Sequence, residues 1–361
     1  MILLNAAPGI PLYGPSGASA HLRGLANALR PRVVITAREE DRRGRHGSVV
    51  VPVEAVGVPG WPSWLGPWQE YTEVWTARRV ARAALRHAER SAPTLIWERH
   101  SLFSDAGWKV HAKTGAPWLL EVNAPLVAER LRFESVRRVA WARAWERDVL
   151  TAAPVVAGVS RWLCGWLADM GCRRVVHLPN GVEPHVGDRD GTRRELGLEG
   201  AFVVGFVGSM KPWHGVERIP EILDALPEAV ALVVGDGVVP AHPRLIRVAH
   251  VEEARLADLV AAMDVGLAPY GADAPPWFCP LKVLAYRAQG TPVIATDVGD
   301  CRALVGEGGS VTSDLVEGIR TWRGRRATPW VRSWAEVAEE GRIAFQPFSL
   351  HPPVRSPNGT P

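Results

Sequence analysis

Short apolar runs alternate with helical stretches along most of this chain, and this alternation constrains the fold more than any other feature. In the first half, apolar runs lie at 2–5, 33–35, 49–51, 94–97 and 118–122, and helical patterns lie between them, for example at 18–29 and 76–90. Short apolar strands separated by helices are typical of a parallel sheet that is covered on both faces. This half of the chain is therefore predicted to be a doubly wound α/β domain.

The pattern then starts again. Strands are predicted at 202–207, 230–234, 244–248, 265–268 and 292–296, and helices at 216–226, 252–263 and 281–289. A chain of 361 residues is long enough for about two domains at ~150 residues each. We therefore predict an α/β fold of two doubly wound Rossmann-like domains, with a ligand bound where the strands end. The boundary is expected near 157–160, giving domains at 1–158 and 159–325.

Composition excludes several other classes of protein. Hydrophobic residues make up 47% and charged residues 22%, which is ordinary for a globular protein. No apolar run reaches about 18 residues, and the first residues lack the positive start of a signal peptide, so we expect neither a spanning helix nor secretion. The four cysteines include no C-x-x-C pair, so reduced thiols in a cytoplasmic protein and no metal site are expected.

Charge is uneven along the chain. Residues 1–150 carry 21 Lys or Arg against 14 Asp or Glu, while the remainder is slightly acidic. A basic first half suits an anionic acceptor, a membrane surface or nucleic acid, and equally a solvated surface rich in arginine. Nucleic-acid binding is not assigned, because no recognised binding module accompanies the basic stretch.

Two glycine-containing loops could bind phosphate. The loop at 208–215 contains Ser209, Lys211 and His214 just before a predicted helix, whose N-terminus favours anions. Lysine is scarce here, with four among 42 basic residues, so Lys211 is notable. The first loop, which includes Ser16 and Gly17, does not fit G-x-G-x-x-G and reads either as a phosphate-binding turn or as a simple tight turn.

Several stretches, in order, resemble the retaining glycosyltransferases of family 4, which have the GT-B fold. The resemblance covers about residues 5–345 and is carried by the glycine turn with His21, the segments beginning at 98, 121, 159, 179 and 207, and the Pro-Leu-Lys segment ahead of 290–295. It implies two domains facing a cleft and transfer of a sugar from a nucleotide diphosphate to an acceptor hydroxyl with retention of configuration. The segment at 326–346 resembles the family's last helix, which crosses back to the first domain, and 347–361 is predicted to be a flexible tail.

The resemblance implies roles for individual residues. Lys211 would stabilise the charge on the departing diphosphate, and His100 and Asn123 would face the reacting centre, although His100 could equally be a packing residue. Residues that would bind the donor are Gly17, Ser209, His214, Gly235, Asp236, His250, Val251, Leu281 and Lys282. Residues that would bind the acceptor are Ser16, His21 and Glu121. The nucleotide sugar is a co-substrate, and neither a cofactor nor an obligatory metal is implied.

One departure from the family concerns its two glutamates, which stand eight positions apart. Here these positions hold Trp277 and Ala285, so a carboxylate that would accept hydrogen bonds from the ribose hydroxyls is missing. Loss of such a bond typically costs ~1.5 to 3 kcal/mol. Lys282 lies beside this gap and could contact phosphate instead.

Aromatic and basic residues gather before and within the helix predicted at 76–90. Trp61, Trp64, Trp68, Tyr71 and Trp75 precede it, and five arginines lie within it. Such residues could stack on sugar rings or touch anionic lipid, giving peripheral contact with the inner face of the membrane, or the tryptophans could simply fill a core.

The sequence thus predicts a retaining glycosyltransferase whose acceptor is a natural product, a glycolipid or a saccharide. One alternative is a catalytically weakened relative that acts as a binding or auxiliary partner protein. A second alternative is a nucleotide-sugar epimerase or phosphorylase on the same architecture. The sequence assigns no oligomeric state.

Overall fold

The computed structural model describes residues 1–38, 41, 51–57 and 69–345, which its contacts divide into two compact units. The first unit comprises residues 1–13 and 26–179 together with the chain from residue 337 onward. The second unit comprises residues 14–25 and 180–336.

The first unit is built on a parallel sheet. Its strands in the described residues have the order β3-β2-β1-β4-β5-β6-β7, and every pairing is parallel. Five of them, β1, β2, β4, β5 and β6, are buried along their whole length, as expected of apolar strands covered on both faces. The strands are β1 (Ile2–Asn5), β2 (Val33–Thr36), β3 (Val53–Ala55), β4 (Ile96–Arg99), β5 (Trp118–Val122), β6 (Val155–Gly158) and β7 (Val175–His177).

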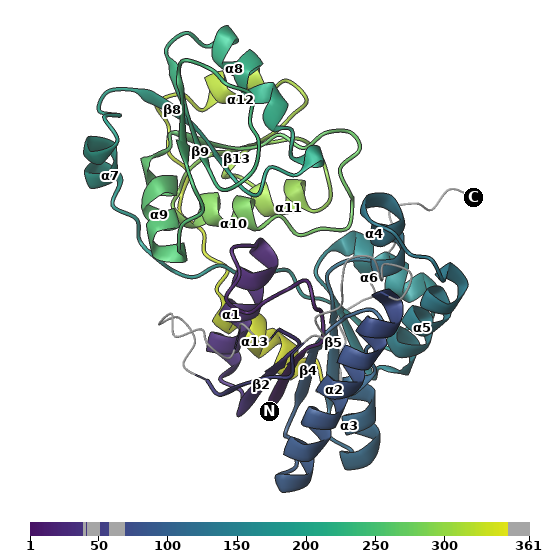
Figure 1. The fold of residues 1–361 in the computed structure, drawn as a ribbon. Helices are drawn as coiled ribbons and strands as arrows, with labels where there is room; N and C mark the ends of the chain where they lie inside the picture. Colours follow the sequence, from purple (N-terminus) through teal and green to yellow (C-terminus); the bar gives the residue numbers. More distant parts are fainter. Residues whose placement is uncertain (39–40, 42–50, 58–68, 346–361) are drawn as a thin grey trace. The chain divides into compact units, whose positions relative to one another are not determined.

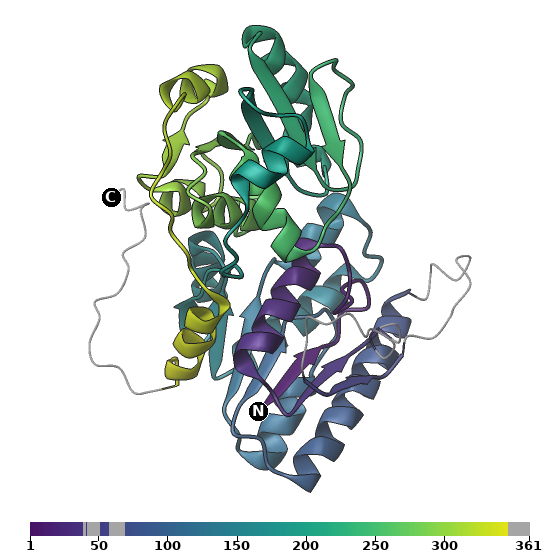
Figure 2. The same cartoon turned by 90° about the vertical axis from the view of Figure 1, so that its left-hand side faces the viewer.

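Helices flank this sheet (Figure 1). They are α2 (Gln69–Arg90), α3 (Ala106–Thr114), α4 (Leu126–Phe133), α5 (Val139–Ala152) and α6 (Arg161–Asp169), with the later parts of α1 (Gly17–Leu29) and α13 (Trp334–Ile343). Figure 2 shows α13 running alongside the sheet. A Cβ at Gly341 would lie 2.3 Å from the Trp97 ring, so the absence of a side chain lets α13 approach β4.

The second unit repeats the architecture. Its strands in the described part of the chain have the order β10-β9-β8-β11-β12-β13, again all parallel. The order reverses between β8 and β11, and ligands of open α/β sheets bind at such a switch point. The strands are β8 (Phe202–Val207), β9 (Ala229–Val234), β10 (Leu245–Val248), β11 (Val265–Ala268), β12 (Val293–Ala295) and β13 (Gly309–Val311).

Both faces of the second sheet are covered (Figure 1). One face packs against α8 (Ile219–Ala225) and α12 (Leu315–Thr321) through a core that includes Phe206, Leu223 and Ile319. The other face carries α9 (Glu253–Ala262), α10 (Leu281–Ala288) and α11 (Cys301–Val305). The remaining elements are α7 (Arg189–Glu195) and two short 3-10 helices, η3 (Pro212–His214) and η4 (Val216–Arg218).

The predicted α/β fold with two doubly wound domains is confirmed, and several strands have the predicted bounds. The predicted strand at 49–51 is not observed at Val51, residues 49–50 lie outside the described residues, and the chain instead forms β3 from Val53. The predicted boundary at 158/159 falls directly after β6, whereas contacts assign α6 and β7 to the first unit as far as Pro179. The predicted helix at 216–226 begins as η4 and continues as α8. The predicted tail at 347–361 lies outside the described residues.

Candidate active site

Two glycine turns meet at the carboxyl ends of β8 and β9 in the second unit. Gly208 has φ +152° and Gly235 has φ +122°, values that side chains rarely permit. A Cβ on Gly235 would lie 2.2 Å from the Gly208 carbonyl oxygen. The two loops therefore pack backbone against backbone, and only glycine fits at Gly235.

Neighbouring residues extend this contact to a third loop. A Cβ on Gly237 would lie 2.7 Å from the Met210 Cβ, and Met210 itself has φ +48°. The His250 backbone N–H donates to Asp236 Oδ1 at 3.2 Å, and Val251 follows directly. The turns after β8, β9 and β10, which carry most of the predicted donor-binding residues, are thus joined at one edge of the sheet.

Lys282 lies beside the first of these turns. Lys282 is the second residue of α10 and is 8% exposed. Its ammonium has no hydrogen-bond partner and lies 3.9 Å from the Phe206 ring centroid and 5.0 Å from that of Tyr270. A Cβ on Gly208 would lie 3.2 Å from Lys282 Nζ, so the bare backbone at Gly208 leaves the ammonium room.

Burial lowers the pKa of the Lys282 side chain. Removal from water lowers the pKa of its ammonium to about 7, and the Cys301 thiol opposes this shift. The attraction of the ammonium to the two aromatic rings compensates for only part of the lost hydration. Among the described residues, no carboxylate pairs with the buried amino group of Lys282.

His214 is neutral and accepts a hydrogen bond from the backbone of its own loop. The Lys211 backbone N–H donates to His214 Nδ1 at 3.3 Å, which assigns the ring proton to Nε2. Burial, Lys282 and Lys211 together lower the pKa of His214 to about 2. His214 therefore carries no charge near neutral pH, and its Nδ1, which accepts from Lys211, is the ring nitrogen nearest to Gly208.

Lys211 and Ser209 complete the loop. Both residues are exposed, and Lys211 immediately precedes η3. Together with Lys282, they provide two amino groups and one hydroxyl around the Gly208 backbone. Such a set of donors, with no carboxylate among them, is suited to a phosphate or diphosphate.

The start of α1 also belongs to the second unit. A Cβ on Gly17 would lie 3.2 Å from Leu281 Cδ1, so Gly17 approaches the beginning of α10. Ser16 Oγ hydrogen-bonds Ser19 Oγ at 3.0 Å and accepts from the Ser19 backbone N–H at 3.1 Å. His21 is buried and its ring stacks on Trp334 with centroids 4.9 Å apart. The side chain of His21 is thus used in packing.

The positions of the two missing glutamates are close to Lys282 in the sequence. Trp277 is buried, and Ala285 is half-buried on α10. The next residue, Tyr286, donates its hydroxyl to the Leu267 carbonyl at 3.1 Å and accepts from the Val207 N–H at 2.9 Å. The Tyr286 hydroxyl therefore bridges β8 and β11 where the two strands end.

The predicted residues of the first unit lie at the ends of β4 and β5. Asn123 Nδ2 donates to Glu121 Oε1 at 2.7 Å, and Trp97 Nε1 donates to Glu121 Oε2 at 2.9 Å. His100 is buried, with its Nε2 3.6 Å from Glu146 Oε1 and neither ring nitrogen hydrogen-bonded. His100 thus faces α5, whereas Asn123 turns back toward Glu121.

A buried carboxyl lies next to His100 on β4. Glu98 Oε1 accepts from Ser104 Oγ at 2.8 Å, and Glu98 Oε2 accepts from the Gly107 N–H at 3.0 Å. Burial outweighs these hydrogen bonds and raises the pKa of Glu98 to about 7. Its partners lie at and just before the start of α3, so Glu98 acts in the structure of the first unit.

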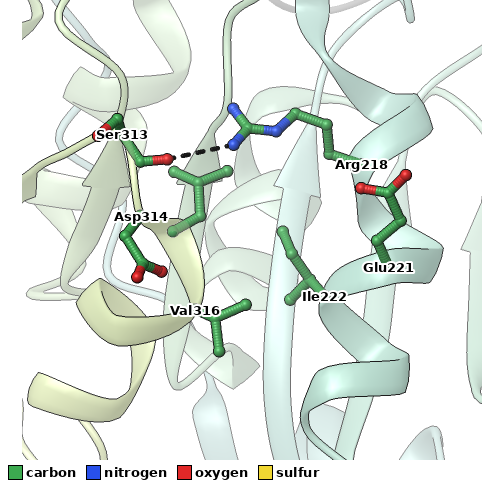
Figure 3. Close-up of a pocket in the computed structure, with 7 residues that line it drawn as sticks. Arg218, Glu221, Ile222, Ser313, Asp314 and Val316 are labelled. Atoms are coloured by element: carbon green, nitrogen blue, oxygen red, sulfur yellow. Dashed lines mark hydrogen bonds between the residues drawn. The ribbon is translucent and has the colours of Figure 1, made fainter.

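A separate hollow of about 380 Å³ lies between η4, α8 and the start of α12 (Figure 3). Arg218 donates to the Ser313 carbonyl at 3.3 Å across it. Its lining includes none of the predicted site residues, so we do not assign the ligand to it. The lining residues are Arg218, Glu221, Ile222, Ser313, Asp314, Leu315 and Val316.

Sequence reasoning missed the aromatic residues that line the site. Phe206 and Tyr270 flank the Lys282 ammonium, and Tyr286 joins the two strands beside it. They lie in ordinary apolar runs, where an aromatic residue reads as core. The one available signal was Tyr270, which directly follows Pro269 at the end of a predicted strand, where ligands bind.

Known proteins share parts of this sequence. Residues 201–320 match the family model described as Glycosyl transferases group 1. A GDP-mannose-dependent alpha-mannosyltransferase from Mycolicibacterium smegmatis is 33% identical over 178 residues, which are 46% of this chain and 45% of that protein. The match thus spans less than half the length of this relative.

Solved structures share the whole fold. HepE from Anabaena, in complex with UDP and glucose, has a TM-score of 0.67 at 18% identity, with 95% of each chain covered. Sucrose-phosphate synthase from Thermosynechococcus elongatus has a TM-score of 0.69 at 17% identity, with 96% of each chain covered. The two doubly wound units thus have the GT-B fold that these structures share.

Two general features of the described residues complete the comparison. No helix among them is both long and apolar enough to span a bilayer. No group of three or more His, Cys, Asp or Glu among them is placed to hold a metal ion.

Proposed function

We propose that this protein is a retaining glycosyltransferase that moves a sugar from a nucleotide diphosphate donor to a hydroxyl of a natural product, glycolipid or saccharide. The observation that carries the proposal is the unpartnered Lys282 ammonium beside the Gly208 backbone, with Lys211 and His214 on the same loop. This cluster lies at the switch point of the second sheet, within the stretch that matches the group 1 family model.

The similar proteins support this donor class. The mycobacterial relative is named for its dependence on GDP-mannose, and the Anabaena structure contains UDP and glucose. Both names refer to a nucleoside diphosphate or its sugar ester. The base and the sugar of the donor differ between them, so the proposal extends only to the shared diphosphate.

In the proposed reaction, the bond between the anomeric carbon and the diphosphate oxygen breaks, and a bond forms to the acceptor oxygen. The acceptor hydroxyl releases its proton to solvent, and the diphosphate leaves with one additional negative charge, so that charge and atoms balance. Lys211, Lys282 and the His214 Nε2–H would stabilise this charge, because charge that develops in the transition state is what the site must bind most strongly. The Gly208–Ser209 backbone would approach the phosphates closely, since Gly208 has no side chain.

The remaining site residues are proposed to contact the base, the ribose, the reacting sugar or the acceptor. Gly235, Asp236, His250 and Val251 would contact the base and ribose, and Gly17 and Leu281 would contact the donor. In the first unit, Asn123 and His100 would face the reacting sugar, and Glu121 would hold the Asn123 amide. Ser16 would bind the acceptor, as would Glu121, whereas the packing of His21 against Trp334 leaves it an indirect role.

The charge on the diphosphate would be met by protein cations without an obligatory metal ion. Lys211 and Lys282 can supply two positive charges. These would neutralise the two negative charges on the diphosphate ester of a nucleotide sugar. Transfer should therefore survive EDTA at unchanged rate. Loss of transfer with EDTA, restored by one divalent metal, would contradict this part of the proposal.

The first experiment is calorimetric titration with UDP, GDP, ADP and dTDP. We expect one diphosphate to bind and Lys211→Ala to weaken it at least tenfold, because a charge-assisted contact to phosphate is lost. The sugar ester of that nucleotide is then incubated with candidate acceptors, and the anomeric configuration of the product is read by NMR. Inversion would reject the retaining mechanism, and absence of nucleotide binding would reject the donor site.

One specific observation favours a second candidate function. Neither Trp277 nor Ala285 supplies the carboxylate of the related enzymes, so the chain could be a weakened relative that binds a ligand or a partner enzyme without turnover. Ala285→Glu tests this directly. A variant that gains transfer where the natural protein has none would support the auxiliary role.

We also propose that the protein acts in the cytoplasm, against the inner face of the membrane. Its four cysteines are free, as in a reducing compartment. On α2, Tyr71 is 46% exposed and Trp75 is 44% exposed, and Arg78 and Arg82 continue the exposed stripe. Trp61, Trp64 and Trp68 lie outside the described residues. Cosedimentation with anionic but not neutral vesicles would support this contact, and its absence would reject it.

A further inference from the structure

The unpaired ammonium of Lys282 has a consequence beyond donor binding. We propose that the site takes up a proton together with its nucleotide sugar, and that the proton goes to the Lys282 amine. The inference rests on the proposed donor site and names a chemical event at that site. It is carried by geometry, namely a buried and unpartnered amino group that lies against the Phe206 and Tyr270 rings, beside the bare backbone of Gly208.

The surroundings of Lys282 do not hold its charge in the ligand-free protein. Phe206 on β8 and Tyr270 after β11 present ring faces at 3.9 and 5.0 Å, and no hydrogen-bond acceptor reaches Nζ. An ammonium in such a place is costly, because desolvation disfavours the charged form. The neutral amine is accordingly populated at ordinary pH, consistent with a pKa of about 7.

The titratable groups around Lys282 leave it as the proton acceptor. On the neighbouring loop, the pKa of His214 is lowered to about 2, so this ring stays neutral. Lys211, on the same loop, is exposed. Burial raises the pKa of Cys301 on α11 and of Cys279 to about 12, and raises those of Tyr270 and Tyr286 further. The acidic groups on this side, Asp297 and Asp300, flank Cys301, and Asp297 is paired with Arg302 at 2.6 Å.

An arriving diphosphate changes this balance. Its negative charge, placed at Gly208 within a few ångströms of Nζ, favours the ammonium and raises the pKa of Lys282. Between the old and new pKa values the bound complex holds one more proton than the free protein. Linkage then requires that nucleotide-sugar affinity fall as pH rises above about 7, by up to tenfold per pH unit.

The test is titration calorimetry with GDP-mannose and UDP-glucose, whose diphosphate esters have no group that titrates near neutral pH. Binding at pH 8 is measured in buffers of different ionisation enthalpy, and the slope of observed against buffer enthalpy gives the protons taken up. We expect roughly 0.5 to 1 proton per ligand at pH 8 and close to none at pH 6, where the free amine is already protonated.

Two variants assign the proton. Lys282→Met, which keeps the length and apolar packing of the side chain, should abolish the uptake and weaken binding at pH 6. Lys211→Met is the matched control, because it removes an exposed lysine of the same loop and should weaken binding while the uptake persists. Lys282→Arg, which stays charged, gives a second variant if the methionine variant is unfolded by circular dichroism; it should bind without uptake.

The outcomes separate this inference from the proposed function. Binding with a zero slope at pH 8 would overturn the inference and leave the donor site intact. Uptake that persists in Lys282→Met would also overturn it by assigning the proton elsewhere. No binding of either nucleotide sugar would overturn the inference together with the donor site.

Discussion

The Tyr286 hydroxyl both accepts a hydrogen bond from the backbone of the second sheet and donates one to it. The Val207 N–H and the Leu267 carbonyl lie on neighbouring strands that end at the site, and the Tyr286 hydroxyl bonds to both of them. A buried N–H or carbonyl without a partner costs about 1 to 3 kcal/mol. The residue after Val207 is Gly208, so the same hydroxyl fixes the backbone from which the proposed phosphate loop departs.

We predict that Tyr286→Phe lowers the free energy of unfolding by about 1 to 3 kcal/mol, because two buried backbone groups lose their partner at once. It should also weaken nucleotide binding through the displaced loop. Urea unfolding and calorimetry measure the two effects. Tyr270→Phe is the control, because the Tyr270 hydroxyl makes no hydrogen bond to the described residues. Unchanged stability is expected for it, and an equal loss would contradict the assignment.

Lys282 gives the opposite prediction at the same scale. Its folded-state pKa of about 7 lies below the ordinary value of 10.5, so the unfolded chain binds more protons between these pH values. The stability of the second unit should therefore rise with pH from about 7 upward and be lowest below pH 7. Lys282→Met should remove this pH dependence and raise the melting temperature at pH 6, as measured by differential scanning calorimetry. A lower melting temperature of Lys282→Met at pH 6 would show that the ammonium does not destabilise the folded state.

At the scale of elements, the site depends on turns that pack without side chains. Gly208 and Gly235 are in contact through their backbones, and the Gly235 conformation at φ +122° excludes other residues. The turns of β8 and β9 can therefore lie closer together than loops that carry side chains. This proximity puts the loop of Lys211 and the loop of Asp236 at one edge of the sheet.

We predict that Gly235→Ala destabilises the protein by about 3 kcal/mol or more and abolishes nucleotide binding, because a Cβ would collide with the Gly208 carbonyl in a backbone conformation that is itself strained. Gly200→Ala is the matched control, since Gly200 also has positive φ, at +71°, but has open space around its Cβ position. The control should lose about 1 to 2 kcal/mol and bind normally. Equal effects in both variants, measured by urea unfolding, would show that strain alone matters.

Particular elements show how far the sequence predicts this protein. The strands 118–122, 202–207 and 265–268 were predicted at their observed bounds, because each is a short, largely apolar run that ends directly before Asn123, Gly208 or Pro269. The aromatic walls around Lys282 could not be predicted, since residues 206, 270 and 282 are brought together only by the sheet order. The orphaned amine of Lys282 depends on this tertiary contact, so the sequence indicated its scarcity but not its burial. His21 was predicted to bind the acceptor, and His100 to be either catalytic or a packing residue. Their neighbours in the structure, Trp334 and Glu146, lie far away in the chain, so the sequence could not reveal these contacts.

At the scale of the whole molecule, the two units have titrating groups of opposite effect. Glu98 in the first unit has its pKa raised to about 7 from 4.5, so the folded state binds more protons than the unfolded state between these values. The stability of the first unit should therefore fall as pH rises from about 4.5 to 7. Lys282 makes the stability of the second unit rise from about pH 7 upward.

We predict that scanning calorimetry resolves these trends as separate shifts. The transition of the first unit should move down between pH 5 and 7, and that of the second unit should move up between pH 7 and 9. Glu98→Gln should flatten the first trend and leave the second in place, whereas Lys282→Met should do the reverse. If either variant altered both trends, the two units would not unfold as separate cooperative bodies.

The second unit folds around a buried amino group, that of Lys282, for which no described residue provides a counter-ion. Hydrophobic cores normally exclude such a group, and here Phe206 and Tyr270 enclose it. The missing counter-ion is supplied from outside the chain when the proposed donor diphosphate arrives. The donor would then stabilise the folded second unit as well as serve as its substrate. The protein would be most stable in the presence of the molecule it consumes.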